Sequence, residues 1–213
     1  MRIEIIPVQL RMLDNEHPRT PGLHQGKILR KMAAERGYLK EVDASDLSMV
    51  EVNESGFWES LDPESQIRMA VGMAWEEWYS RQLDDVSFHP GELVVDGVYM
   101  TPDGESLEFV HGSGYVPAVH EIKATSKSTN TVSGLNGDKN WLWRAQMLGY
   151  CKAMNTNIAY LHVLFLYGDY ERPFKMQVRC WRFEFTWTEI EMNWKGLLGF
   201  IKHHQRLAQH EDY

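Results

Sequence analysis

The chain has 213 residues, of which 43% are hydrophobic and 12% aromatic; this is enough apolar side chain for a packed core and excludes a wholly disordered protein. The formal net charge of −8 excludes a uniformly basic nucleic-acid coat protein, although an acidic protein with a local basic groove remains compatible with it. The two cysteines, Cys151 and Cys180, are too few and too far apart for a structural zinc site or an iron–sulfur cluster.

The N-terminal third predicts an extension rather than a separate domain. Residues 1–22 contain three prolines and indicate a short strand followed by an extended arm. A helix is expected from just after Gly22 to about Arg36, where Gly37 can end it. Residues 38–61 are polar and acidic and indicate a connector. We therefore expect residues 1–61 to be an arm and helix attached to a core formed by residues 62–213.

The core is expected to begin with a helix, because Asp62-Pro63-Glu64 is a typical helix start. The helix should run from Pro63 to about Leu83. Its predicted buried stripe comprises Ile67, Val71, Ala74, Trp75 and Trp78. A strand over 92–100, a β-turn at Thr101–Gly104, and strands over 105–110 and 116–124 are expected to follow.

The second half predicts two more helices and two more strands. A Ser/Thr-rich loop over 125–137 precedes a helix from about Lys139 to Met154. Residues 158–167 form the most apolar stretch and indicate a central strand. Another strand over 176–185 leads to a final helix over about 189–209, capped by Thr186 or Thr188. This order of elements predicts one mixed α/β domain. No apolar run reaches the ~18 residues of a membrane span, and the first residues do not resemble a signal peptide, so a cytoplasmic protein is expected.

The segment Glu121-Ile122-Lys123 carries the first candidate for chemistry. Residues two apart on a strand share a face, so Glu121 and Lys123 project together while Ile122 faces the opposite layer. A carboxylate can hold a divalent cation, and a neighbouring lysine can orient water or offset charge in a transition state. The alternative is an ordinary solvated ion pair.

Four further residues add to this candidate. Asp96 interrupts an apolar strand pattern and therefore needs a partner, either a metal shared with Glu121 or water. Glu76 lies one turn after Gly72 on the same helix face. Gln146 and Tyr150 are likewise one turn apart, and both side chains can bind a phosphate or a base, or simply flank a helix.

The order of these pieces resembles the PD-(D/E)XK nuclease superfamily, in particular its RecB-like and phage exonuclease-like branch. The resemblance covers about residues 64–167 and implies a restriction-endonuclease-like α-β-β-β-α-β core: a mixed central β-sheet flanked by helices. It implies that Mg²⁺ or Mn²⁺ binds Glu76, Asp96, Glu121 and the backbone carbonyl of Ile122, with Lys123 as the catalytic lysine. The iron–sulfur cluster of some RecB-like nucleases is excluded by the cysteine count.

The aspartate of the motif has two candidates. A literal Pro-Asp occurs at Pro102-Asp103, whereas Asp96 follows a valine. Asp96 is preferred on geometry, because a turn tip seven residues further along an extended strand lies ~23 Å away. With Asp96 in the motif, residues 104–117 would be an insertion.

The resemblance implies DNA as the substrate. Beside Gln146 and Tyr150, the side chains expected to contact DNA are Lys127, Lys139, Arg144 and Trp141. A metal-dependent exonuclease of phage-type recombination or DNA end processing is expected; a structure-specific endonuclease and a catalytically silent binding module are the alternatives. The sequence leaves open a homo-oligomer and a single-strand annealing or recombination partner.

Overall fold

A computed structural model describes residues 22–37, 63–132, 141–168, 170, 172–173 and 175–211. The expectations for the arm, the connector, the Asp62 cap and Lys139 lie outside these residues.

The fold is mixed α/β, as predicted. A five-stranded sheet has the order β2 (Ser87–Phe88), β5 (Gly104–Val110), β6 (Gly114–Thr125), β7 (Ile158–Phe165) and β8 (Gln177–Glu184). The β6 and β7 strands are parallel and the other neighbours are antiparallel, so the central sheet is mixed. A second sheet has the order β1 (Leu23–His24), β4 (Val98–Met100) and β3 (Leu93–Val95).

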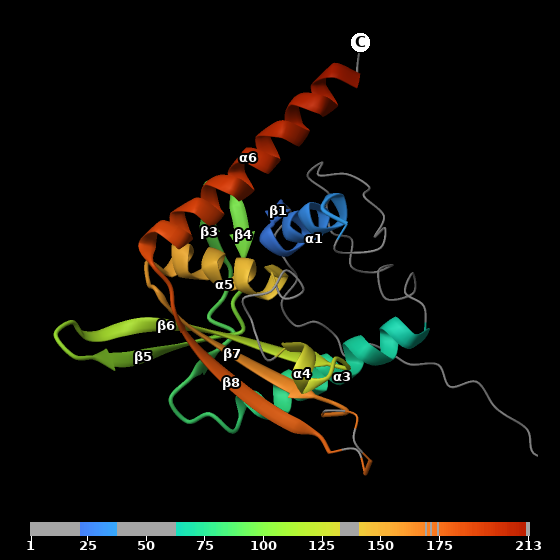
Figure 1. Cartoon of the computed structure of the whole chain (residues 1–213). Coiled ribbons are helices and arrows are strands. Elements are labelled where there is room, and N and C mark those ends of the chain that lie inside the picture. The colour runs from blue at the N-terminus through green and yellow to red at the C-terminus, as the bar shows by residue number, and fades with distance from the viewer. Residues whose placement is uncertain are drawn as a thin grey trace, which may run out of the picture.

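Helices cover both faces of the five-stranded sheet. Figure 1 shows α1 (Gln25–Glu35), α5 (Trp141–Met154) and α6 (Trp187–Glu211) grouped on one side of it. Their apolar faces form the main core with Val119, Leu161 and Val163 of the sheet. On the other face Trp75 of α3 (Pro63–Ser80) packs on Ile122 and Leu164, forming a smaller core. A short helix, α4 (Thr129–Val132), follows β6.

The ends of several predicted helices and strands are confirmed within a few residues. At these ends the periodicity of apolar residues and the capping residues indicate the same boundary. The final helix begins with a reciprocal capping box: Thr186 Oγ1 accepts from Glu189 N at 3.2 Å, and Glu189 Oε2 accepts from Thr186 N at 2.9 Å. Of the helices in the described residues, none is both long and apolar enough to cross a membrane.

The predicted buried stripe of α3 is wrong in part. Trp75 is buried, but Ile67 and Trp78 are 53% and 57% exposed. The helix meets the sheet through a narrow face, on which Tyr79 stacks against Trp75 with ring centroids 4.5 Å apart. A spacing of three to four residues identifies a possible apolar face of a helix. It does not show how much of that face packs against the rest of the protein.

The predicted strand over 92–100 is a hairpin. Asp96 and Gly97 have φ of 50° and 78° and connect β3 to β4 as a two-residue turn. Two positive φ values in succession match the type I′ turn, which favours Asp-Gly. The predicted turn at Thr101–Gly104 is wrong: residues 101–103 link β4 to β5, and Gly104 already belongs to β5. Residues 104–117 are no insertion either, because they form β5 and the start of β6 within the central sheet.

Candidate active site

Glu121 and Lys123 lie on one face of β6, as predicted. Their side chains form an ion pair between Lys123 Nζ and Glu121 Oε1. The Glu121 side chain is 0% exposed, whereas that of Lys123 is 27% exposed. Ile122 between them points to the opposite layer and packs beside Trp75. The carboxylate is thus buried, while the lysine side chain keeps part of its surface exposed.

Asp103 lies directly beside this pair. The β5–β6 ladder ends at the pair Gly104↔His120, so the Ile122 N–H lies beyond it. Asp103 Oδ2 accepts a hydrogen bond from that N–H at 2.6 Å. A charge-assisted bond of this kind holds the carboxylate against the backbone between Glu121 and Lys123.

Asp96 does not pair with Glu121, and the geometric preference for it is corrected. The hairpin turn at Asp96-Gly97 reverses the chain, so the ~23 Å separation assumed for one extended strand does not apply. The Asp96 carboxylate instead accepts a hydrogen bond from Trp194 Nε1 at 2.7 Å. The acid in the apolar pattern does have a partner, but this partner is the indole of a buried tryptophan on α6.

Glu76 approaches the same site from α3. Its charge acts on both Glu121 and Lys123, and so does that of Asp103. The Glu76 side chain is 29% exposed, and its Oε1 lies 3.8 Å from Nδ1 of His89. The charges of three carboxylates, from β6, α3 and the segment between β4 and β5, therefore act on one lysine.

The electrostatics follow from this crowding. Burial raises the pKa of Glu121 to about 8; the charge of Asp103 adds to the rise, and Lys123 only partly offsets it. Burial lowers the pKa of Lys123, but the charges of Glu121, Asp103 and Glu76 together outweigh burial and raise it. Negative charge at this point thus exceeds what the single lysine neutralises.

The donor set fits a hard divalent cation in its chemistry. Carboxylates are ligands that Mg²⁺ accepts, and Glu121 Oε2 is buried without a hydrogen bond from any described residue. A buried carboxylate oxygen without a partner is costly, and a cation would satisfy it. No three acid, histidine or cysteine side chains of the described residues already stand close enough to hold an ion.

Gln146 and Tyr150 lie beside the site but bond to protein. Gln146 Nε2 donates to Tyr150 Oη at 2.6 Å, and Tyr150 Oη donates to the Thr101 carbonyl at 3.0 Å. Thr101 is two residues before Asp103, so this pair fixes the segment that carries the aspartate. From α1, buried Gln25 donates to the carbonyls of Ala145 and Gln146, which ties α1 to the same part of α5.

The basic residues near the site have two kinds of partner in the structure: acidic residues of α6 and the rings of tryptophans. Arg144 and Lys152 pair with Glu189 and Glu191 of α6. At the start of α5, the Lys127 ammonium lies 5.3 Å from the centre of the Trp143 ring. On the same turn, the Arg36 guanidinium lies 4.6 Å from that of Trp141. The basic and aromatic side chains that face one another are therefore Lys127 with Trp143 and Arg36 with Trp141. Arg144 is engaged with α6 instead.

A buried hydrogen-bonded chain, not foreseen from the sequence, crosses the sheet on the α3 side. It joins Tyr79 Oη to His162 Nδ1 (3.1 Å), His162 Nε2 to His120 Nδ1 (2.9 Å) and His120 Nε2 to Ser106 Oγ (2.8 Å). Every ring nitrogen has a partner, so both histidines are accommodated as neutral groups. Burial lowers the pKa of each to about 4. The signal in the sequence was a histidine inside each of two apolar strands.

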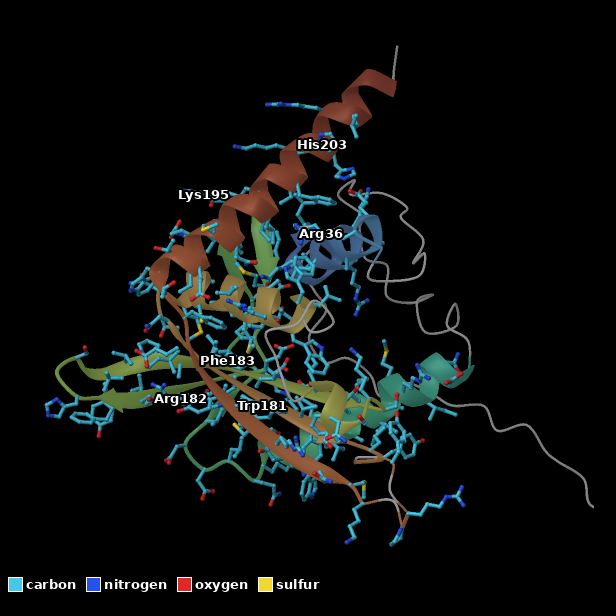
Figure 2. All side chains as sticks on the ribbon, viewed as in Figure 1. Arg36, Trp181, Arg182, Phe183, Lys195 and His203 are labelled. Carbon is cyan, nitrogen blue, oxygen red and sulfur yellow. The ribbon has the colours of Figure 1, made fainter. Side chains whose placement is uncertain are left out.

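The β8 strand forms one edge of the sheet. Figure 2 labels Trp181, Arg182 and Phe183 in succession on it, with Arg36 directly after α1 and Lys195 and His203 on α6. Trp181 and Phe183 pack against the main core. Arg182, which has the opposite parity, pairs with Glu108 of β5, and Tyr160 also donates to Glu108. Arg36, Lys195 and His203 thus lie with the helices on one side of the sheet.

No family model and no curated protein sequence matches the chain. Among solved structures, it is similar to the alkaline exonuclease LHK-Exo from Laribacter hongkongensis, with 13% identity over 90% of this chain and 93% of that one and a TM-score of 0.45. The complex of LHK-Exo with dAMP gives 14% identity, the same coverage and the same TM-score. A phage-related exonuclease from Haemophilus somnus 129PT gives 11% identity over 87% of this chain and 83% of that one, with a TM-score of 0.43.

Proposed function

We propose that the chain is a metal-dependent deoxyribonuclease whose active site comprises Glu76, Asp103, Glu121 and Lys123. The observation that carries the proposal is the buried Glu121 carboxylate, which has one oxygen without a hydrogen bond beside two further carboxylates and a single lysine. A surface ion pair would not require burial or a cluster of like charges. A site for a divalent cation and a phosphodiester explains both.

Mg²⁺ or Mn²⁺ is the cation that this set suits. Glu76, Asp103 and Glu121 would hold it, with the backbone carbonyl of Ile122 as a further ligand. Bound there, it would lower the pKa of water and offset charge on the phosphoryl oxygens. Asp103 replaces Asp96 in this set, because the Asp96 carboxylate accepts a hydrogen bond from Trp194.

The side chains of the chain have separate tasks in the hydrolysis. Lys123 carries the positive charge of the site and is partly exposed, so its ammonium can donate to the attacking water or to a phosphoryl oxygen. Asp103, fixed by the Ile122 N–H, holds its carboxylate where the acids meet. The water oxygen bonds to phosphorus, the bond from phosphorus to the 3′ oxygen breaks, and a proton from water ends on that oxygen.

DNA is the proposed substrate, held at the start of α5. Cations over the rings of Trp141 and Trp143 present positive charge together with flat apolar surface. Phosphates bind positive charge, and unpaired bases stack on flat aromatic rings. This combination suits a strand with exposed bases, as at a DNA end, so exonuclease activity is favoured and structure-specific endonuclease activity is the alternative.

The experiment uses end-labelled linear DNA and closed circular DNA with Mg²⁺, Mn²⁺ or EDTA. We expect cleavage of linear DNA with either metal, none with EDTA, and at least a hundredfold loss in Glu121→Gln and Lys123→Ala. Lys195→Ala, on the outer side of α6, is the matched control and should keep full activity. Cleavage of closed circles would indicate the endonuclease. Full activity of either site variant, or cleavage in EDTA, would overturn the proposal.

A nucleic-acid-binding module without catalysis is the second candidate. It is favoured by the finding that no three potential ligands of the described residues are already assembled around a common point. Titration of the protein with Mn²⁺ separates the two, because the silent module predicts no saturable binding and the nuclease predicts binding that Glu121→Gln weakens.

A further inference from the structure

His89 occupies a constrained position beside the acidic site. It lies between β2 and β3, and its φ of 52° is in the left-handed region, which few residues other than glycine adopt. Its backbone N–H donates to the Asp103 carbonyl at 3.0 Å. A non-glycine residue held in this region by a specific contact is a recognised mark of functional sites.

The neighbouring chain leaves this segment little freedom. Phe88 pairs with Gly104 across β2 and β5. A Cβ at Gly104 would lie 2.9 Å from Val86 and 3.2 Å from Phe88, so the two segments are in close contact. His89 is therefore placed by the same residues that place Asp103.

The imidazole of His89 lies close to Glu76 of the site. Its Nδ1 lies 3.8 Å from Glu76 Oε1, which is beyond hydrogen-bond distance, and half of the side chain is exposed. Within the described residues the ring donates to no other group, so a donor is available beside the partly exposed Glu76.

A phosphate that approaches three carboxylates meets repulsion. The one lysine among them is already paired with Glu121. A hydrogen-bond donor beside Glu76 can hold a phosphate oxygen without being a ligand of the cation. Resting on the proposed function, we propose that His89 is a substrate-positioning residue whose ring N–H donates to a non-bridging phosphate oxygen of the bound DNA strand.

The test measures kcat and KM for linear DNA in His89→Ala and His89→Gln. A hydrogen bond to a charged group is worth about tenfold in binding, so His89→Ala should raise KM about tenfold and leave kcat within about threefold. His89→Gln keeps an N–H donor at similar reach and should recover most of the affinity. Mn²⁺ titration of the protein alone should be unchanged in His89→Ala.

His111 provides the matched control, because it is an exposed histidine in the β5–β6 turn; His111→Ala should leave both constants unchanged. An unchanged KM in His89→Ala, a loss of Mn²⁺ binding, or no recovery in His89→Gln would each overturn the assignment. If wild-type protein cleaves DNA and KM does not respond to His89, only this inference fails. If wild-type protein cleaves no DNA, both the proposed function and the proposed role of His89 are wrong.

Discussion

Glu121 should make the stability of the protein fall as the pH rises through neutrality. Burial and Asp103 raise its pKa from 4.5 to about 8, so between these values the folded state holds a proton that the unfolded state has lost. One such proton gives a slope of about −1.4 kcal/mol per pH unit. The buried histidines act oppositely, because their folded pKa values are lowered to about 4 and stability rises up to about pH 6.5. Glu121 therefore dominates between about pH 6.5 and 8.

The assay is urea unfolding at several pH values in this window, without metal and with Mg²⁺. Wild-type protein should lose about 2 kcal/mol from pH 6.5 to 8 in EDTA, and Glu121→Gln should lose much less. Mg²⁺ should stabilise the wild type more at pH 8 than at pH 6.5, because a cation binds the ionised carboxylate. Glu64→Gln, an exposed carboxylate of α3, is the control and should keep the wild-type slope. If the wild-type free energy of unfolding does not change with pH, or if it has the same slope in Glu121→Gln, then Glu121 is not the source of the pH dependence.

Three further substitutions give separate predictions. Asp96→Asn should lower the free energy of unfolding by about 1–2 kcal/mol, since Trp194 loses a charged acceptor, and should leave cleavage within a few-fold in a steady-state assay. Tyr79→Phe should leave Nδ1 of His162 without a partner, reduce thermal stability by about 1–2 kcal/mol, and lower kcat several-fold because α3 carries the glutamate of the site. Tyr150→Phe should lower kcat with little change in KM, because the carbonyl that Tyr150 binds lies two residues before Asp103, the proposed catalytic aspartate; a rise in KM alone would instead indicate direct DNA contact.

The fold followed from the sequence where local signals agreed with one another. The apolar run 158–167 and the alternation over 176–185 predicted β7 and β8, because buried and half-buried strands have distinct patterns. The predicted buried stripe of α3 is too wide, because the spacing of apolar residues does not show how many of them pack against the rest of the protein.

The shared face of Glu121 and Lys123 could be predicted from the sequence, whereas the position of Asp103 beside them could not. Glu121 and Lys123 share a face because side chains alternate on a strand. Asp96 was preferred because residues 92–100 were taken as one strand; Asp96-Gly97 is itself the dipeptide that favours a two-residue hairpin. His89 had no local signal, since its place depends on the long-range pairing of β2 with β5.

The role of Asp103 is tested by comparing Asp103→Asn with Asp96→Asn in one assay on end-labelled linear DNA with Mg²⁺. Asp103 is bound to the backbone between Glu121 and Lys123, whereas Asp96 is bound to Trp194. The site described here predicts that Asp103→Asn loses at least a hundredfold in kcat/KM with its fold retained, and that Asp96→Asn stays active. An active Asp103→Asn, or an inactive but folded Asp96→Asn, would contradict it.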